Sequence, residues 1–470
     1  MFVALVVACA FFMETFTGTV ITTALPQMAL SLGSNPVQLS LAVTAYMLSL
    51  AVFIPASGWI ADTYGARTVF RAAIGVFTLS SVLCGLCNNL PELISARILQ
   101  GVGGAMMVPV GRLVLLRTVD RSEFVRAMAY VTVPAFIGPV LGPPIGGFIT
   151  TYVSWRWIFF LNVPIGLLGM VLVSLRIENY KEPNTPPLDW QGFLLTGISV
   201  SCLIYSLDLA ARAAIGVEFL ILLLVGAAIG FWATFHARHH THPLLNLSLL
   251  DIPTFGLLTW GGIFFRLAGG AFPYLLPVLL QVGFGLSAFA YGPITLADAL
   301  GAVSMNALAP AIFRRLGFRR AMVGNGFISA VAVAAASSFS ISMPATIMFV
   351  VLFLAGFSKS LQYNGLSTLI YADVDPARMS AATSLASMVQ QLANGAGVAI
   401  GAVLLEAALV LRGAPSTGLS AIDVRWSFLV VGVFALVSVL FFRRLSPQAG
   451  AEFSGHGVRL ARAHSVEAED

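Results

Sequence analysis

The sequence predicts an all-α membrane protein that crosses the bilayer many times, and two observations support this class. Of the 470 residues, 58% are hydrophobic and only 10% are charged, whereas soluble domains usually contain about 45–50% and 25%. The apolar residues are also grouped into segments, most of them close to the roughly 20 residues that a helix needs to cross a bilayer. We therefore expect a polytopic helical protein with little mass outside the membrane.

Fourteen apolar segments can be marked, each bounded by charged residues or by clusters of Pro, Asn and Gly, which end helices. They lie at residues 3–25, 39–60, 68–87, 92–116, 127–150, 156–175, 190–209, 216–236, 254–280, 288–313, 320–341, 345–366, 380–411 and 427–442. The first segment has no Lys or Arg before it, so we expect a membrane span and not a cleaved signal peptide. Residues 445–470 are polar and of mixed charge, and we expect them to form a disordered tail.

The 25 Lys and Arg residues indicate how the spans are oriented. Counted over the loops, 17 lie on one side, four lie on the other and four lie inside segments. Because basic residues collect on the cytoplasmic side of a membrane protein, we expect both termini in the cytoplasm. No basic run exceeds two adjacent residues, so we expect no nucleic-acid partner despite the net charge of +5.

The Cys and His residues give no clear sign of a metal or redox site. Cys84 and Cys87 lie in an apolar segment without a second Cys pair or a His cluster nearby, and we interpret them as small hydrophobic residues. The loop 236–242 contains four His whose spacing could hold a metal, but no carboxylate or Cys accompanies them before Asp251. We interpret this loop as a solvated turn and predict neither a metal nor a cofactor.

Residues 138–147 read Gly-Pro-Val-Leu-Gly-Pro-Pro-Ile-Gly-Gly inside the apolar segment 127–150. Such a run should break a helix in water, but in a membrane the neighbouring helices can satisfy the carbonyls that proline leaves free. Glycines at every fourth residue share one bare face, which another helix can approach closely or slide along. The candidate residues of this contact are Gly138, Pro139, Gly142, Pro143, Gly146 and Gly147.

Ionisable side chains inside apolar segments mark either a transport pathway or a buried pair. Glu14 lies within its segment beside a run of Thr, and burial would favour its neutral form, so we interpret it as a proton carrier. A static carboxyl that is hydrogen-bonded to a neighbouring helix is the alternative. Arg97 could adjust the protonation of a carboxylate, although a purely structural pairing explains it equally well. Asp298 is the second candidate for proton coupling.

Other polar side chains inside the segments predict a substrate cavity. Four cations stand against two carboxylates there, and this excess indicates an anionic or zwitterionic cargo. The candidate cavity residues are Arg112, Arg266, Lys359, Gln362 and Asn364.

The loop after the second segment predicts a conformational latch. Its sequence is Gly58-Trp-Ile-Ala-Asp-Thr-Tyr-Gly-Ala-Arg67, in which glycine allows a tight turn and Asp62 can accept a hydrogen bond from a helix N-terminus. Arg67 can pair with Asp62. The candidate latch residues are Gly58, Asp62, Gly65 and Arg67. A comparable basic loop in the second half indicates a duplicated six-helix unit.

These runs together resemble the major facilitator superfamily and, within it, the bacterial fourteen-helix drug:proton antiporters. Residues 58–67 resemble the family's loop motif between helices two and three, residues 97–105 its fourth-helix motif, and residues 138–147 its antiporter motif. Residues 154–166 and 188–192 also resemble the fourteen-helix subgroup, and residues 358–372 resemble a Gram-negative branch of multidrug exporters. The family usually carries an aspartate where this chain has Glu14, and a glycine or basic residue where it has Ala66.

The resemblance implies two six-helix bundles, at residues 1–175 and 253–444, with two inserted helices within residues 176–252. The bundles would rock around a central cavity, and residues 138–147 would form the sliding contact between them. We accordingly predict a monomeric, proton-coupled exporter of drugs or other small amphipathic compounds in the bacterial inner membrane, whose partners are its substrate, protons and the lipid bilayer. Export of organic anions or metabolites is the alternative. A membrane sensor or enzyme is a remote third possibility, because no catalytic cluster is visible.

Overall fold

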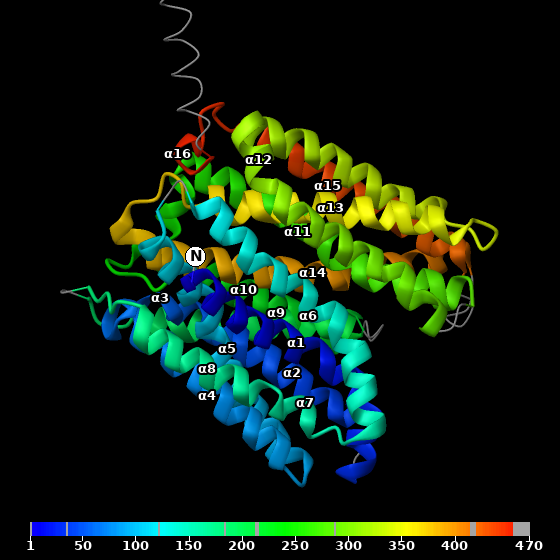
Figure 1. The fold of residues 1–470 in the computed structure, drawn as a ribbon, viewed down its shortest axis with the longest axis horizontal. Coiled ribbons are helices and arrows are strands. Elements are labelled where there is room, and N and C mark those ends of the chain that lie inside the picture. Colours follow the sequence, from blue (N-terminus) through cyan, green and yellow to red (C-terminus); the bar gives the residue numbers. More distant parts are fainter. Residues whose placement is uncertain are drawn as a thin grey trace, which may run out of the picture.

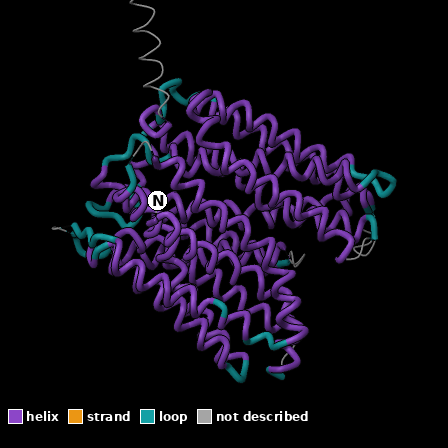
Figure 2. The backbone as a smooth tube through the Cα atoms, in the orientation of Figure 1, coloured by secondary structure: helices purple, strands orange, loops and turns teal. Residues whose placement is uncertain are grey.

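The structure is a computed structural model, and it describes residues 2–454 apart from positions 34–35, 121–122, 183–184, 212–215, 286–287 and 414–419. The described residues form helices and connecting loops, without a strand (Figures 1 and 2). The α-helices are α1 (Phe2–Ser31), α2 (Pro36–Phe53), α3 (Ser57–Tyr64), α4 (Ala66–Leu86), α5 (Leu90–Thr118), α6 (Phe124–Tyr152), α7 (Trp157–Phe160), α8 (Asn162–Arg176), α9 (Trp190–Ala211), α10 (Val217–His239), α11 (Pro253–Pro277), α12 (Ala288–Ala335), α13 (Ala345–Leu369), α14 (Met379–Arg412), α15 (Ala421–Phe442) and α16 (Ala451–Ser454). Single turns of tighter or wider helix lie at η1 (Ile54–Ala56), η3 (Leu247–Asp251), η4 (Val278–Gly283), η5 (Ala336–Ser338) and η6 (Pro376–Arg378).

Twelve stretches of the described helices are long and apolar enough to cross a membrane. One of them, Leu296–Ser338, has 43 residues, about twice the length that a single crossing requires. It contains Gly317, whose backbone (φ 71°, ψ 163°) is not helical. In α6 only Phe124–Val133 forms an apolar stretch among the residues that were searched. The predicted count of fourteen crossings therefore stays a prediction, and the twelve spans establish a helical membrane protein.

Two glycines interrupt the helices where the chain must turn sharply. Gly65 separates α3 from α4 with φ 91°, and Gly317 interrupts α12 with φ 71°. Residues with a side chain rarely adopt such positive φ values, because Cβ comes too close to the backbone. Both glycines thus let a chain of nearly continuous helix change direction within one residue.

The helices pack in two groups that lie on either side of the molecule in Figure 1. In one group α4 packs on α5 and α8, α1 packs on α6, and α2 packs on α5. In the other, α12 packs on α13 and α15, and α11 packs on α14 and α15. The groups meet where α6 contacts α12 and where α14 contacts α3 and α5, while α9 contacts both α2 and α14. Functional side chains on α5, α6 and α14 therefore lie at the boundary between the groups.

The residues directly after α15 are folded, which corrects the prediction of a disordered tail for that part. Leu445 and Phe453 are buried, and the Phe453 ring packs 5.4 Å from the ring of Phe124 at the start of α6. These two apolar side chains hold the chain against the helices through residue 454. Residues 455–470, the rest of the predicted tail, lie outside the described residues.

Candidate functional site

Glu14 lies within α1, and its Oε2 atom is buried without a hydrogen-bond partner. Arg112 of α5 lies close enough for its charge to act on this carboxyl. The hydroxyls of Thr15 and Thr19, which follow Glu14 in the helix, each donate to a carbonyl of α1 itself, at 2.9 and 3.0 Å. Burial favours a neutral carboxyl and a nearby cation favours an ionised one. The two influences oppose each other at Glu14, and its role as a proton carrier stays a prediction.

Arg97 is fully buried in α5 and holds helices together. Its Nη1 donates to Oε1 of Gln100 at 2.6 Å, and its guanidinium lies 4.2 Å from the ring centre of Tyr46 in α2. Gln100 in turn donates to Ser81 of α4 at 2.7 Å. Within the described residues Arg97 forms no ion pair, so this geometry agrees with the structural reading of Arg97. Its predicted effect on the protonation of Glu14 stays a prediction.

Asp298 and Lys359 form an ion pair between α12 and α13. The Nζ atom of Lys359 lies 2.5 Å from Oδ2 of Asp298, and the two side chains are only 16% and 23% exposed. They border a small void of about 20 Å³ that Phe265 and Phe272 also line, which is room for about one water molecule. The pair takes up one cation and one carboxylate, so it leaves the predicted excess of two cations unchanged.

Arg112 and Arg266 carry that excess near the boundary between the groups. Arg266 of α11 is 3% exposed, and its Nε atom is buried without a hydrogen-bond partner. The charge of Arg112 acts on Arg266, so the two guanidinium groups lie within electrostatic reach of each other. Arg112 Nη2 also donates to Oε1 of Gln390 in α14 at 3.0 Å. This polar contact joins the two groups of helices.

Gln362 and Asn364 are fully buried in α13 and bind other side chains of the protein. Gln362 accepts from Asn325 at 2.9 Å, and Asn364 donates to Asn306 at 2.7 Å. Asn364 also accepts from the hydroxyl of Thr132 in α6 at 3.1 Å. Of these two residues, predicted to line a substrate cavity, Asn364 therefore bonds across the boundary between the groups, whereas Gln362 bonds within the second group.

The predicted latch lies at the contact between α3 and α14. Asp62 accepts a hydrogen bond from the hydroxyl of Ser380. The backbone N–H of Gly58 donates to Oγ of Ser384 at 2.8 Å, and the hydroxyls of Ser57 and Ser384 are 2.7 Å apart. The first and second halves of the sequence are thus joined at this end of the molecule.

Arg67 does not pair with Asp62, which corrects the predicted arrangement of the latch. Because Gly65 turns the chain, Arg67 Nη1 reaches the carbonyl of Ile177 instead, at 3.5 Å. Arg117 of α5 takes the position beside the carboxylate, with its Nη2 3.5 Å from Oδ1 of Asp62. No local pattern points to Arg117, because it lies 55 residues away from Asp62 along the chain.

Two glycines of the run at residues 138–147, Gly138 and Gly142, pack against α1. A Cβ atom at Gly138 would collide with the hydroxyl of Thr15, and one at Gly142 would lie 2.6 Å from the hydroxyl of Thr19. Gly146 is buried, whereas a Cβ at Gly147 would meet nothing within 4 Å. Gly138 and Gly142 thus face a helix of their own group, and the predicted sliding contact between the two halves stays a prediction. Four-residue spacing marks a bare face of a helix, and here that face is turned toward a neighbour in the same group.

The run nevertheless forms one helix, as predicted for a membrane. The backbone at Pro139 and Pro143 is helical within α6. α6 also contacts α12 and α13, and Thr132, before the glycine run, makes the hydrogen bond to Asn364. The N-terminal part of α6 is therefore the part that reaches the C-terminal helices.

Two larger cavities lie on the side of the molecule that holds the latch. One, of about 730 Å³, is lined by α6 and α12 residues that include Tyr130, Asn306 and Arg314, together with Phe453. The other, of about 300 Å³, is lined by the latch residues Asp62 and Ser380 and by the segments around residues 185–189 and 241–246. Neither is lined by the predicted cavity residues Arg112, Arg266, Lys359, Gln362 or Asn364.

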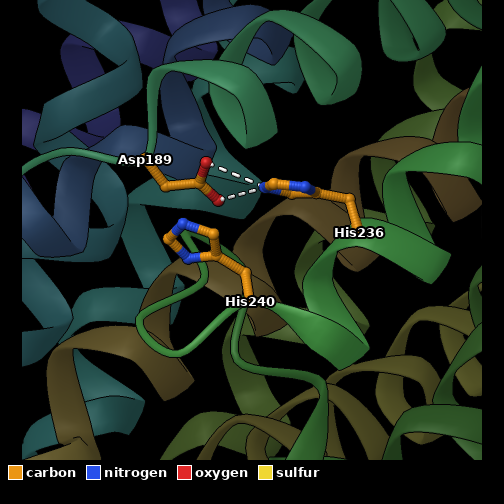
Figure 3. A group of neighbouring side chains, drawn as sticks. All are labelled: Asp189, His236 and His240. Atoms are coloured by element: carbon orange, nitrogen blue, oxygen red, sulfur yellow. Dashed lines mark hydrogen bonds and ion pairs between the residues drawn. The ribbon is translucent and has the colours of Figure 1, made fainter.

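The His loop has a carboxylate partner that its own sequence neighbourhood does not contain. Nε2 of His236 lies 2.9 and 3.1 Å from the two carboxylate oxygens of Asp189, directly before α9, and the ring of His240 lies beside them (Figure 3). Burial raises the pKa of Asp189, but the N–H groups of Gly192 and Leu244 together with His236 outweigh burial and hold this pKa below its ordinary value. The interpretation of the loop as a simple solvated turn is thus incomplete.

Sequence reasoning missed the residues that join the two groups of helices. Gln390, Ser384 and Thr132 make these contacts. A pair of glutamines at 390–391 inside the apolar segment 380–411 was a usable signal, because uncharged polar side chains in a span often bind another helix. The other two residues are small hydroxyl side chains, which are common in spans and carry no such signal.

Comparison with known proteins gives consistent results. The family model described as Major Facilitator Superfamily matches residues 7–398. Two relatives are named "Putative multidrug resistance protein MdtD": the protein of Pectobacterium carotovorum is 35% identical over 445 residues, 94% of each chain, and that of Salmonella newport is 39% identical over 401 residues, 85% of each chain.

Two solved structures share the fold at 14% sequence identity and a TM-score of 0.65. They are the human organic anion transporter MFSD10, which matches 94% of this chain and 99% of its own, and the proton:xylose symporter XylE, which matches 97% and 98%.

Proposed function

The chain belongs to the major facilitator superfamily of membrane transporters, and on this premise we propose that it is a proton-coupled antiporter that exports drugs or other small amphipathic compounds from bacteria. The family match identifies a transporter and not an enzyme. The names of the MdtD relatives favour multidrug export. Proton coupling is proposed from the chemistry of the site.

The observation that carries this proposal is the placement of Glu14. Its buried Oε2 atom has no hydrogen-bond partner, and Arg112, whose charge acts on it, is hydrogen-bonded to Gln390 across the boundary between the groups. When the groups separate at this point, Arg112 loses its partner on α14. The cation is then free to move toward or away from the carboxyl, which changes how strongly Glu14 holds a proton.

Alternating access supplies the rest of the mechanism. The contacts of Gly58 and Asp62 with α14 hold the molecule closed on the side of the latch. In the bacterial inner membrane that side is the cytoplasmic one, because the basic loops lie there and both termini would then be cytoplasmic. A proton taken up by Glu14 from outside would be released to the cytoplasm after the latch opens, in exchange for the substrate.

We further propose fourteen crossings, with residues 1–175 and 253–444 as the two rocking units and residues 176–252 as the inserted pair. The helix α12 would cross twice, with its turn at Gly317, where the backbone leaves the helical conformation. The 29-residue α6 would cross once. These two assignments account for the difference from the twelve spans.

The test is transport in proteoliposomes that contain the purified protein. A pH gradient should drive uptake of a cationic dye by the wild type, and addition of dye should release protons. The Glu14→Gln variant should bind dye but should lose both coupled fluxes. Glu218→Gln, an exposed carboxyl in the first turn of α10, is the matched control and should transport normally. Coupled dye and proton fluxes in Glu14→Gln at the wild-type rate would refute the assignment of the proton carrier.

Export of organic anions is a second candidate, favoured by Arg112 and Arg266. Both are almost fully buried, and each has a buried Nε atom without a hydrogen-bond partner. A carboxylate substrate could accept from these atoms. Arg266→Ala should then abolish efflux of an organic acid such as citrate, whereas Lys359→Ala should affect it less because Asp298 already neutralises Lys359. Unchanged organic-acid efflux in Arg266→Ala, together with measurable dye efflux, would exclude this candidate.

A further inference from the structure

Three side chains with metal-binding atoms converge where the start of α9 meets the end of α10. Asp189 directly precedes α9, whereas His236 lies in the last turn of α10 and His240 directly follows that helix. One ligand atom from each residue can be chosen so that all three lie within 4.8 Å of one another. Figure 3 shows the rings of His236 and His240, both next to the carboxylate of Asp189. The cluster is separate from the proton carrier and from the latch contacts.

The hydrogen bonds around Asp189 leave room for a cation. Each carboxylate oxygen accepts one backbone N–H, that of Gly192 at 2.8 Å or that of Leu244 at 3.2 Å. A carboxylate has about four acceptor positions, so these two bonds orient it and leave one position on each oxygen. Nε2 of His236 occupies that remaining side. Backbone donors of this kind hold a metal-binding carboxylate in place.

The position of His240 is not explained by the Asp189–His236 hydrogen bond alone. His240 is exposed, yet its ring lies 4.9 Å from the ring of His236 at an angle of 33°. Its Nδ1 accepts the N–H of His242 at 3.3 Å, which places the proton of the neutral ring on Nε2. Binding of a metal through Nε2 would move this proton to Nδ1 and replace that hydrogen bond. Two His at positions i and i+4 on one helical face form a well-known half of a zinc site.

We propose that Asp189, His236 and His240 bind one divalent transition-metal cation, for which Zn²⁺ is the best match. Two imidazoles and a carboxylate are ligands that Zn²⁺ accepts, with a fourth position open to water. In a tetrahedral site with bonds of about 2.1 Å the ligand atoms are about 3.4 Å apart, so small rotations of the exposed imidazole of His240 and the largely buried imidazole of His236 would close the site. The metal would replace the hydrogen between His236 and Asp189, and any proton on either imidazole would be released to solvent.

Metal binding at this position would brace the segments that line the cavity beside the latch. Asp189, His242 and Leu244 border the cavity of about 300 Å³, which Asp62 and Ser380 also border. The cavity provides a route by which the ion can enter. A bound ion would join the start of α9 to the segment after α10, and would thereby restrain one wall of that cavity. This inference does not depend on what the protein transports.

The test is metal binding by the full-length protein in detergent, purified through a tag that contains no histidine. Co²⁺ serves as the spectroscopic probe and Zn²⁺ as its competitor. The wild type should bind one Co²⁺ with an absorption spectrum of low coordination number. His240→Ala and Asp189→Asn should each weaken binding about 10- to 100-fold. His239→Ala is the matched control, because the ring of His239 bonds to the carbonyl of Phe235 in its own helix, and should bind like the wild type.

Thermal unfolding gives a second measurement that does not rely on the variants folding identically. Zn²⁺ should raise the Tm of the wild type and of His239→Ala, and should not raise that of His240→Ala, whose exposed side chain can be removed with little effect on the metal-free protein. Equal Co²⁺ affinity in the wild type and in His240→Ala would overturn the proposal. An equal loss of affinity in His239→Ala would also overturn it, because the binding would then not depend on this cluster.

Discussion

Substitution of Gly58 by alanine should open the latch by a predictable amount. An added Cβ would lie 2.7 Å from the carbonyl oxygen of Ser380 and 2.8 Å from the hydroxyl of Ser384. Ordinary contacts require about 3.5 Å, so α3 and α14 would have to separate by about 0.8 Å. The closest atom is backbone and cannot rotate away. The separation should therefore break the contacts at the latch.

The cost can be estimated from the hydrogen bonds that join α3 to α14 at this point. Ser384 accepts from the N–H of Gly58 at 2.8 Å and shares a hydrogen bond with Ser57 at 2.7 Å. Each bond contributes about 0.5–1.5 kcal/mol, so their loss would destabilise the closed state by about 1–3 kcal/mol. That difference corresponds to a shift of about 5- to 150-fold in the ratio of closed to open molecules.

The shift can be measured by double electron–electron resonance (DEER), which gives the distribution of distances between two spin labels. The labels are placed at Tyr64 and Ala377, which are exposed on either side of the latch. Gly58→Ala should increase the population at the longer distance by that factor. Gly324→Ala is the matched control, because a Cβ there meets nothing within 4 Å, and should leave the distribution unchanged. An unchanged distribution in Gly58→Ala would refute the reasoning that this contact holds the closed state.

Three further predictions concern stability. Gly142→Leu should lower the free energy of unfolding in detergent by about 1–3 kcal/mol, because its Cβ would already overlap α1. Gly147→Leu, at a position with open space, should leave the stability unchanged. Equal effects of the two substitutions would contradict the packing. Asp298→Asn should lower the free energy of unfolding by less than the roughly 3–5 kcal/mol that is lost when a fully buried ion pair is broken. Adding Lys359→Gln should recover most of the loss in Tm. A double variant that is no more stable than the single one would show that the two side chains are not coupled. Gly65→Ala should cost at least about 1–2 kcal/mol, because φ is 91° there; wild-type Tm in this variant would disprove the strain.

The sequence predicted what depends on composition and local pattern. Hydropathy located the helices because a span must be apolar along its whole length, and the glycine spacing correctly indicated a close helix contact within residues 138–147. Gly58 and Asp62 could be singled out because glycine and a carboxylate at a helix boundary have few other uses, and both contact α14; that they act as a latch stays a prediction. Family membership follows from the same motifs, and the family match confirms it.

The partners of these residues could not be predicted, because a pattern along the chain marks a face and not the neighbour that covers it. Gly142 faces α1 instead of the C-terminal helices. Asp62 pairs with Arg117 instead of Arg67 because the turn at Gly65 moves Arg67 away. The carboxylate beside His236 belongs to a residue 47 positions earlier in the chain. A motif that covers only the His loop does not contain that residue and cannot predict it.

The contacts between the two groups of helices also limit what can drive transport. Beyond the latch, the described polar contacts across the boundary include Arg112 with Gln390 and Thr132 with Asn364. With two hydrogen bonds at Ser384 and about 0.5–1.5 kcal/mol each, such contacts favour the closed state by only about 2–6 kcal/mol. A ligand shifts a conformational equilibrium only by its difference in affinity for the two states. Since one pKa unit corresponds to about 1.4 kcal/mol, protonation of one carboxyl would offset these contacts only if its pKa differed between the two states by roughly 1.5–4 units. On the proposed mechanism, such a pKa difference and the substrate's own difference in affinity would together supply the energy that opens the closed state.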